Sequence, residues 1–250
     1  MFRISLSDAQ LWKSLATAIS TLIEEGDFIA TPDGIKLRSM DPSHIAMVDF
    51  EWLKSGFEEY ECQEATRIRI NIASMLKLLK RVSSDEKLEL LYNDKTKKLN
   101  LTLKGKFLRK FTMPTLDPSS DEQPTPKITF TSKIKLATTV LRDIIDDVQA
   151  VSDNVRLETT PEKLTAAATT ELSSAVIELE KASELLIELD VKEPSKATFN
   201  LNYLAEIVKA GAAASEIVTV EFSSNLPIRV GFDFPQGKLH YYLAPRLEAE

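Results

Sequence analysis

The side chains that most often carry out chemistry in enzymes are scarce in this chain. Its 250 residues include two histidines, His44 and His240, and a single cysteine, Cys62. The sequence contains no glycine-rich phosphate loop, no paired-histidine metal motif and no nucleophile elbow. One cysteine also excludes an intrachain disulfide framework and a cysteine-based zinc site. We therefore expect no catalytic residue, no cofactor and no metal.

Three aspartates at helical spacing are the best candidates for a metal site. Asp143, Asp146 and Asp147 follow Arg142 directly. Carboxylates at this spacing beside a cation are more typical of a solvated or salt-bridged helix face than of a metal site. We interpret the cluster as charged surface.

The basic residues suggest binding chemistry instead. Four segments with helical periodicity carry cations away from their apolar stripes. These cations are Lys13, Lys77, Lys80, Arg81, Arg142 and Lys209. If they share one surface, they can follow a phosphate backbone without reading bases, because lysine acts as a long, mobile point charge. Ordinary solvated helix faces remain the alternative, and Glu206, which corresponds to Lys77, weakens the pattern.

The correspondence between these helices comes from an internal repeat. Residues 31–51 align with residues 160–180 without a gap, at an offset of 129 residues (160 − 31). A repeat of this length predicts a duplicated domain rather than a solenoid unit. The charges repeat as well, with Lys13 on Arg142 and Lys80 on Lys209.

A proline-rich segment separates the two copies. Residues 114–127 hold four prolines among small and acidic side chains. Proline lacks a backbone donor and biases its neighbours toward extended conformations, which predicts a semi-rigid connector. We predict an N-terminal domain over residues 1–113, a linker over 114–127 and a C-terminal domain over 128–250.

Within each copy, short alternating strands surround two amphipathic helices. The first helix is capped by Ser7 or Asp8, and its apolar face continues to Ile23. The other helices are expected over residues 74–82, about 136–151 and about 202–213, and a strand over residues 128–132 opens the second copy. Consecutive short strands joined by tight turns favour antiparallel sheets with helices packed on one face. The fold class is therefore α+β.

Composition limits the mode of binding. The formal net charge of −7 argues against wrapping nucleic acid with the whole surface, although a segregated basic face remains possible. No run of about 18 apolar residues and no secretory leader is present, so we expect a soluble, unexported protein with no membrane partner.

Several segments together resemble the proliferating cell nuclear antigen family, the sliding clamps of archaeal and eukaryotic DNA replication. The segments are Asp33–Ile35, Ser39–His44, Ser74–Arg81, Ser152–Asp153 and Tyr241–Arg246. The resemblance, nearest to the archaeal type, spans nearly the whole chain. It implies two similar clamp domains, each with two strand-helix-strands units. It also implies a head-to-tail ring of three subunits with helices lining the hole, antiparallel sheets outside and the cations facing encircled duplex DNA.

The resemblance also implies a docking site for short peptides. Through it the clamp loader, DNA polymerase, flap endonuclease and DNA ligase would bind during replication and repair. The matching positions are Met40, His44, Ile45, Met47, Pro227, Tyr242, Ala244, Pro245, Arg246 and Leu247. From the residues alone, the apolar members are equally compatible with core packing on a strand. Only the first copy carries the motif, because Met40 and His44 fall on Thr169 and Ser173.

The ring contact implied by the resemblance joins the strand near residues 108–113 to the strand near residues 174–179 of the next subunit. The predicted interface residues are Arg81, Leu108, Arg109, Lys110, Asp143, Asp146, Asp147, Ala175 and Ile177. Their opposite charges at the two ends of the subunit favour ion pairs across the contact.

The linker differs from that of many relatives. Residues 117–126 are short and polar and lack the pair of aliphatic residues that would roof the peptide pocket. This favours an alternative, a specialised subunit of a heterotrimeric or checkpoint-type clamp. The expected location is the cytoplasm, beside the nucleoid, for an archaeal protein and the nucleus for a eukaryotic one.

Overall fold

The chain forms two compact units, each with its own core. The computed structural model describes residues 2–118, 123–124 and 126–247. The first unit comprises Met1–Pro42, Val48–Pro124 and Phe234–Leu239, and the second comprises Ser43–Met47, Thr125–Asp233 and His240–Glu250. The domain boundaries given above stay predictions. Residues 1, 119–122, 125 and 248–250 of those ranges lie outside the described residues.

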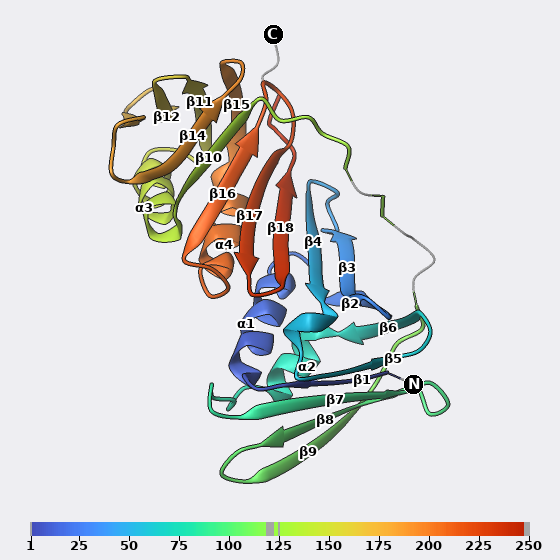
Figure 1. Cartoon of the computed structure of the whole chain (residues 1–250). Coiled ribbons are helices and arrows are strands. Elements are labelled where there is room, and N and C mark those ends of the chain that lie inside the picture. Colours follow the sequence, from blue (N-terminus) through green and yellow to red (C-terminus); the bar gives the residue numbers. More distant parts are fainter. Residues whose placement is uncertain (1, 119–122, 125, 248–250) are drawn as a thin grey trace. The chain divides into compact units, whose positions relative to one another are not determined.

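The first unit places two helices among short strands (Figure 1). Its elements are β1 (Phe2–Leu6), α1 (Ala9–Ser20), β2 (Glu25–Thr31), β3 (Gly34–Met40), β4 (Ala46–Leu53), η1 (Lys54–Gly56), β5 (Glu59–Cys62), β6 (Thr66–Asn71), α2 (Ile72–Leu78), β7 (Lys87–Asn93), β8 (Lys98–Lys104) and β9 (Leu108–Pro114). The strands pair in the orders β5-β1-β7-β8-β9 and β4-β3-β2-β6. The strand β5 was not expected from the sequence.

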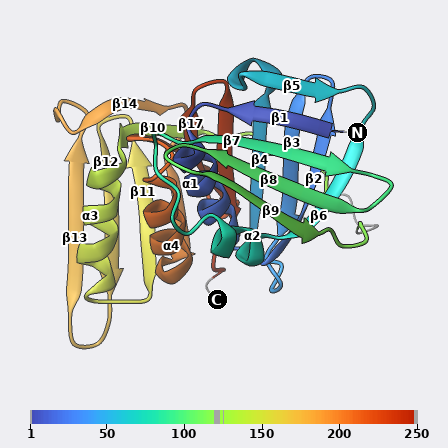
Figure 2. The same cartoon turned by 90° about the horizontal axis from the view of Figure 1, so that it is seen from below.

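The second unit repeats the order of the first. Its elements are β10 (Ser132–Ala137), α3 (Thr138–Gln149), β11 (Asn154–Thr160), β12 (Lys163–Thr169), β13 (Ser174–Glu180), β14 (Leu186–Val191), β15 (Ser195–Asn200), α4 (Leu201–Gly211), β16 (Ile217–Phe222), β17 (Ile228–Phe234) and β18 (Gly237–Leu243). The strands pair in the orders β14-β10-β16-β17-β18 and β13-β12-β11-β15. Figure 2 shows α3 and α4 side by side, with β13 at the outer edge of its sheet.

The repeat found in the sequence is a structural repeat. α1 and α3 begin at Ala9 and Thr138 and both have 12 residues, so the offset of 129 residues (138 − 9) holds in three dimensions. The predicted α+β class is confirmed, since antiparallel strand pairs dominate and the helices are few. No helix among the described residues is long and apolar enough to cross a membrane.

The first helix shows how the sequence sets an element boundary. The Asp8 carboxylate accepts hydrogen bonds from the backbone N–H groups of Gln10 and Leu11, at 2.8 and 3.2 Å, and so caps α1. Trp12, on the buried face of α1, stacks on Trp52 of β4 with ring centroids 6.2 Å apart. The predicted cap and the inward face of this helix are therefore both present.

The helix predicted over residues 74–82 is wrong at both ends. The Asn71 side chain accepts a hydrogen bond from Ser74 N–H at 2.8 Å, so α2 begins at Ile72. It ends at Leu78, because Leu79 leaves helical geometry with φ −89° and ψ 5°. Lys80 and Arg81 therefore lie in the turn after α2 and not on the helix.

The strand predicted over residues 128–132 is also wrong. The observed strand, β10, runs from Ser132 to Ala137, with Ile134 and Leu136 buried and Lys133 and Lys135 partly exposed. The preceding segment is held by side chains instead: Thr131 N–H donates to Ser223 Oγ at 2.9 Å. Residues 128–131 alternate between apolar and polar side chains, as strands do, but they form no strand in the described part of the chain.

The described part of the linker is attached to the first unit. Leu116 N–H donates to the Arg69 carbonyl at 2.8 Å, and Lys97 pairs with Asp117 at 3.0 Å. Further along, Arg38 Nη1 donates to the carbonyl of Gln123 at 3.3 Å. Leu116, Asp117 and Gln123 of the linker therefore all contact the first unit.

Candidate nucleic-acid interface and docking sites

The first unit gathers its predicted cations around two contacting helices. Lys13 projects from α1 and donates through Nζ to the Lys80 carbonyl at 3.0 Å. Lys77 is exposed on α2, which packs against α1, and Lys80 and Arg81 are exposed in the following turn. The four side chains thus belong to one region, although only Lys13 and Lys77 are helical.

The second unit offers a weaker version of the same arrangement. Arg142 on α3 and Lys209 on α4 are exposed, and these two helices pack together. Arg142 lies 3.6 Å from Asp143, and Lys209 lies 4.0 Å from Glu206. Exposed pairs at these distances screen the cations only in part, because water competes for both partners.

A hollow beside α2 joins two groups of predicted residues. Its volume is about 570 Å³. It is lined by Lys77, Leu78, Lys80, Arg81, Ser83, Glu86, Phe107, Arg109 and Phe111. The residues predicted for DNA and those predicted for the ring contact therefore meet there, with Arg81 in both groups.

The Arg109 side chain already forms an ion pair within its own subunit. Its Nη2 donates to both oxygens of Glu86, at 2.5 and 2.6 Å, and Glu86 is buried. Burial alone would raise the pKa of Glu86, but the hydrogen bonds from Arg109 and from Ser83 outweigh it and lower the pKa. Lys110, the neighbouring cation, is exposed.

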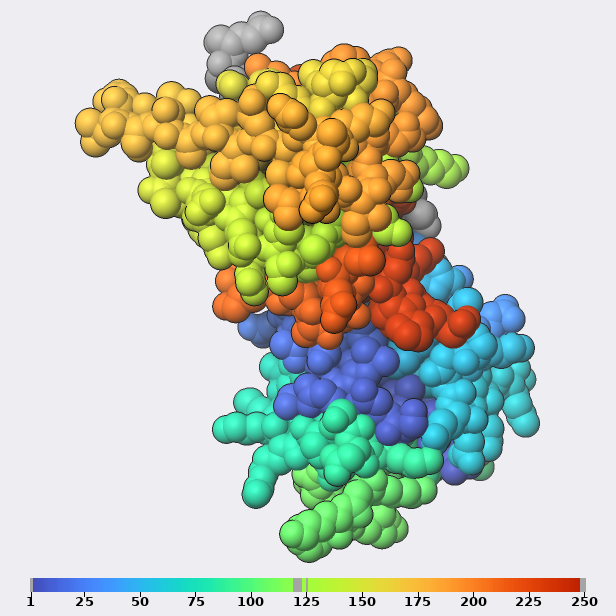
Figure 3. Space-filling model, turned by 60° about the vertical axis from the view of Figure 1, so that its left-hand side comes forward, coloured from blue at the N-terminus to red at the C-terminus, as the bar shows by residue number. Residues whose placement is uncertain are grey.

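Each unit ends one sheet with a strand that exposes apolar side chains. β9 is the last strand of β5-β1-β7-β8-β9, and Leu108 at its start is 62% exposed, beside Phe107 at 67%. β13 is the first strand of β13-β12-β11-β15, and its Val176 is 62% exposed. In the space-filling view the turn between β12 and β13, in gold, projects from the second unit (Figure 3). Leu172 in that turn is 98% exposed.

Two predicted interface residues, Ala175 and Ile177, lie on β13. Both are half-buried, whereas Val176 between them lies on the exposed face of the strand. Alternation along a strand assigns its residues to two faces, but it does not say which of the two faces is exposed. Asp143, Asp146 and Asp147 are exposed on α3, which contacts β13.

The predicted peptide site is assembled only in part. Within the second unit, Ala244 N–H donates to the Ile45 carbonyl at 2.9 Å, which places the chain end beside the segment that carries His44. Ile45 is 41% exposed and Leu247 is 71% exposed, while Pro227, Ala244 and Pro245 are half-buried and Arg246 is exposed. Met47 and Tyr242 are buried, so they present little surface to a ligand. Met40 is half-buried in the first unit.

His44 has an unusual backbone. Its φ is 56°, in the left-handed region that few non-glycine residues adopt. This conformation turns the chain just before β4 begins at Ala46. No pattern in the sequence indicated it.

One charged group near the predicted peptide positions was missed by the sequence reasoning. Arg229 on β17 lies over the Phe130 ring, 4.9 Å from its centroid, and its Nε donates to Glu221 at 2.6 Å. Burial would lower the pKa of Arg229, but hydrogen bonds with Glu221 and Tyr242 raise it. It therefore stays charged beside Tyr242. Over the residues that the structure describes, no cluster of three or more metal-ligating side chains occurs.

Two copies of one fold, each with paired helices bearing exposed cations and an edge strand bearing exposed apolar side chains, define the class of DNA sliding clamps. Residues 1–116 match the family model of the proliferating cell nuclear antigen N-terminal domain, and residues 125–247 match that of its C-terminal domain. The chain therefore belongs to the proliferating cell nuclear antigen family. It is a sliding clamp of DNA replication and not an enzyme.

Archaeal relatives and a solved structure are similar along nearly the whole chain. A DNA polymerase sliding clamp of Pyrobaculum aerophilum is 37% identical over 242 residues, covering 96% of both chains. The DNA polymerase sliding clamp of Nitrosopumilus maritimus is 37% identical over 238 residues, covering 95% of both. The crystal structure of proliferating cell nuclear antigen from Thermococcus kodakaraensis superimposes with a TM-score of 0.93 at 26% identity, covering 98% of this chain and 100% of that one.

Proposed function

We propose that three copies of this chain close head to tail into a ring around duplex DNA. Membership of the family already indicates a clamp that self-associates as a ring and works with DNA and DNA polymerase. One observation supports the contact: β9 and β13 are edge strands with exposed apolar residues and opposite charge. The exposed charge is Lys110 on β9, and Glu178 and Glu180 on β13. A heterologous contact that closes leaves neither edge free.

The proposed DNA track consists of the helix and turn cations of both units. The net charge of −7 limits affinity for phosphate, so retention comes from enclosure and not from tight contacts. Mobile cations such as Lys77, Lys80 and Lys209 hold the ring near the duplex axis while it moves. Binding of this kind reads no base sequence.

Partner proteins are proposed to dock short peptides on the segment around His44 and Ile45 and on the chain end around Ala244–Leu247. DNA polymerase, the clamp loader, flap endonuclease and DNA ligase are the proposed users of this site. The exposed part of the site is mainly apolar, which suits aromatic and aliphatic side chains of a peptide. The proposed location is the cytoplasm, beside the nucleoid.

The mass of the purified chain in solution tests the ring. Light scattering is expected to give three times the subunit mass of 28.0 kDa. Lys110→Glu is the sharpest variant, because Lys110 is exposed whereas Arg109 is needed inside its own subunit. This variant should shift the mass toward the monomer. The matched control is Lys95→Glu in the turn between β7 and β8, which makes the same charge change and should leave the mass unchanged.

A specialised subunit is the second candidate, supported by the polar linker. Such a subunit keeps the fold but assembles only with different chains. A wild-type mass that stays at the monomer up to high micromolar concentration would contradict the homotrimer and favour this candidate.

A further inference from the structure

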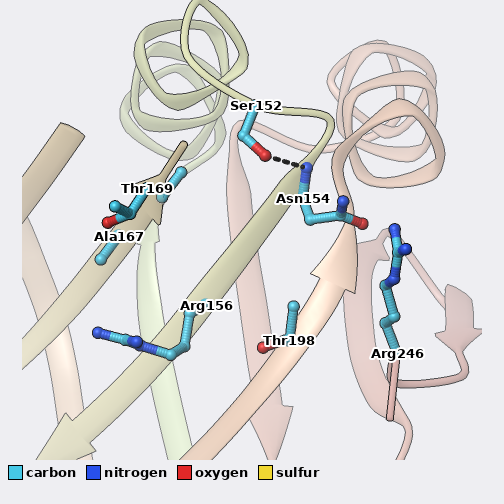
Figure 4. A pocket seen from close by; sticks show the side chains of 8 residues that line it. Ser152, Asn154, Arg156, Ala167, Thr169, Thr198 and Arg246 are labelled. Atoms are coloured by element: carbon cyan, nitrogen blue, oxygen red, sulfur yellow. Dashed lines mark hydrogen bonds between the residues drawn. The ribbon is translucent and has the colours of Figure 1, made fainter. Parts of the chain in front are cut away.

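A polar hollow on the second unit lies next to the proposed peptide site and has no assigned role. Its volume is about 230 Å³. The lining residues are Ser152, Asn154, Arg156, Ala167, Ala168, Thr169, Thr198 and Arg246. Figure 4 shows Arg156 and Arg246 on its two sides, with Ser152 and Asn154 above and Thr198 between them.

The sheet creates this hollow through its pattern of side-chain sizes. Arg156 on β11 stands opposite Thr198 of β15 on one side and opposite Ala167 of β12 on the other. Two small neighbours beside a long side chain leave open space above the strands. The chain end closes the margin, because Arg246 N–H donates to the Thr198 carbonyl at 2.7 Å.

The hollow offers one unused acceptor. Asn154 Oδ1 is buried and has no hydrogen-bond partner among the described residues. The Asn154 backbone N–H donates to Ser152 Oγ at 3.1 Å, which fixes the start of β11. A buried acceptor without a donor costs free energy, and a ligand N–H would remove that cost.

The hollow also offers two cations. Arg156 uses its Nε for Glu158, at 2.8 Å, while its side chain stays 45% exposed. Arg246 forms no ion pair with any residue that the structure describes, and it is exposed. Guanidinium groups present several N–H donors and bind carboxylates in a planar, often bidentate way.

From these groups we propose that the hollow binds an acidic side chain on the flank of a docked peptide. The carboxylate lies between Arg156 and Arg246, and a peptide N–H donates to Asn154 Oδ1. The proposal rests on the proposed docking of peptides at the chain end, since Arg246 belongs to both sites and joins them. The hollow then discriminates between partner peptides, because a neutral or basic flank gains no affinity from the two arginines.

Labelled peptides that differ only in the flank test the proposal. Each carries a core of one glutamine, one aliphatic and two aromatic residues, the composition that the resemblance to sliding clamps implies for docked peptides. Two glutamates, two glutamines or two lysines are placed before or after this core. Fluorescence anisotropy on the wild-type chain is expected to show about three- to tenfold tighter binding for one glutamate-flanked peptide than for its glutamine counterpart. The gain should shrink at high salt.

A charge swap gives the decisive comparison. Arg156→Glu should abolish the preference for glutamate and produce one for lysine, while the glutamine-flanked peptide binds as before. The matched control is Lys181→Glu, an exposed position after β13 that makes a similar charge change and should keep the wild-type preference.

The outcomes separate the two proposals. If no peptide of any flank binds the wild type, the docking site itself is wrong. If all peptides bind equally, or if Arg156→Glu keeps the preference for glutamate, docking stands and the acidic subsite is overturned.

Discussion

Arg109 and Glu86 form an ion pair that links the edge strand β9 to the turn before β7. Arg109, on β9, donates from Nη2 to both Glu86 oxygens, at 2.5 and 2.6 Å, and Glu86 lies just before β7. Glu86 in turn accepts a hydrogen bond from Ser83 N–H at 3.1 Å. The edge strand proposed for the ring contact therefore has an ion pair within the subunit in addition to its backbone pairing with β8.

Replacing Arg109 is expected to destabilise the subunit before it affects any ring. Arg109→Leu leaves the buried Glu86 carboxylate without its cation, at a cost of roughly 2 kcal/mol in the free energy of unfolding. Urea unfolding monitored by circular dichroism measures it. Lys110→Leu, one residue further along, serves as the control. Equal stability of Arg109→Leu and the control would show that the pair contributes nothing.

Acid is expected to weaken the same pair. Because the folded-state pKa of Glu86 is lowered, its contribution is fully present above the unfolded value of about 4.3 and is lost as the pH falls through the folded-state value. Glu86→Gln should therefore flatten the fall in stability below about pH 4.3. Thermal melts of both proteins between pH 3 and pH 6 test this. Parallel curves would mean that other carboxylates dominate.

Gly211 at the end of α4 has no room for a side chain. A Cβ placed there would lie 2.2 Å from Cζ of Phe232, inside the core of the second unit. Gly211→Ala should cost about 1–3 kcal/mol through overpacking. Adding Phe232→Leu to Gly211→Ala should recover part of the loss, measured by the same urea titration. A Gly211→Ala protein as stable as wild type would show that Phe232 moves aside freely.

The proposed DNA track predicts a defect without disassembly. Lys80→Glu combined with Lys209→Glu should reduce stimulation of polymerase processivity while light scattering still reports the assembled mass. Each lost phosphate contact lowers the affinity for DNA. It also reduces the slope of the logarithm of the binding constant against the logarithm of the salt concentration by about 0.9. Lys95→Glu combined with Lys181→Glu provides the charge-matched control. Full stimulation by the first pair of substitutions would remove Lys80 and Lys209 from the track.

The repeat and the fold class could be predicted because they depend on residue spacing along the chain, which both copies share. Asp8 caps α1 because a short acidic side chain satisfies the free N–H groups of a helix start. The buried face of α1 follows from apolar spacing alone. These are local rules, and local rules can be applied along a chain without knowing its neighbours.

The parts that could not be predicted depend on contacts between distant segments. Residues 128–131 alternate like a strand, but Ser223 holds Thr131 instead, and the strand starts at Ser132. α2 ends at Leu78 although its periodicity continues, so Lys80 and Arg81 leave the helix. On β13, Val176 lies on the exposed face while the predicted interface residues Ala175 and Ile177 are half-buried, because pairing with β12 fixes which side chains share a face.

The duplication, the scarcity of catalytic residues and the cations that recur at the repeat offset can all be recognised in the amino-acid sequence. The tertiary structure decided which charges are available. Arg109 forms an ion pair with Glu86 of its own subunit, whereas Lys110 beside it is exposed. It also decided that Arg156 and Arg246, 90 positions apart (246 − 156), flank one hollow. The physical reason is that charge type is a property of a residue, while burial, pairing and proximity are properties of the folded chain.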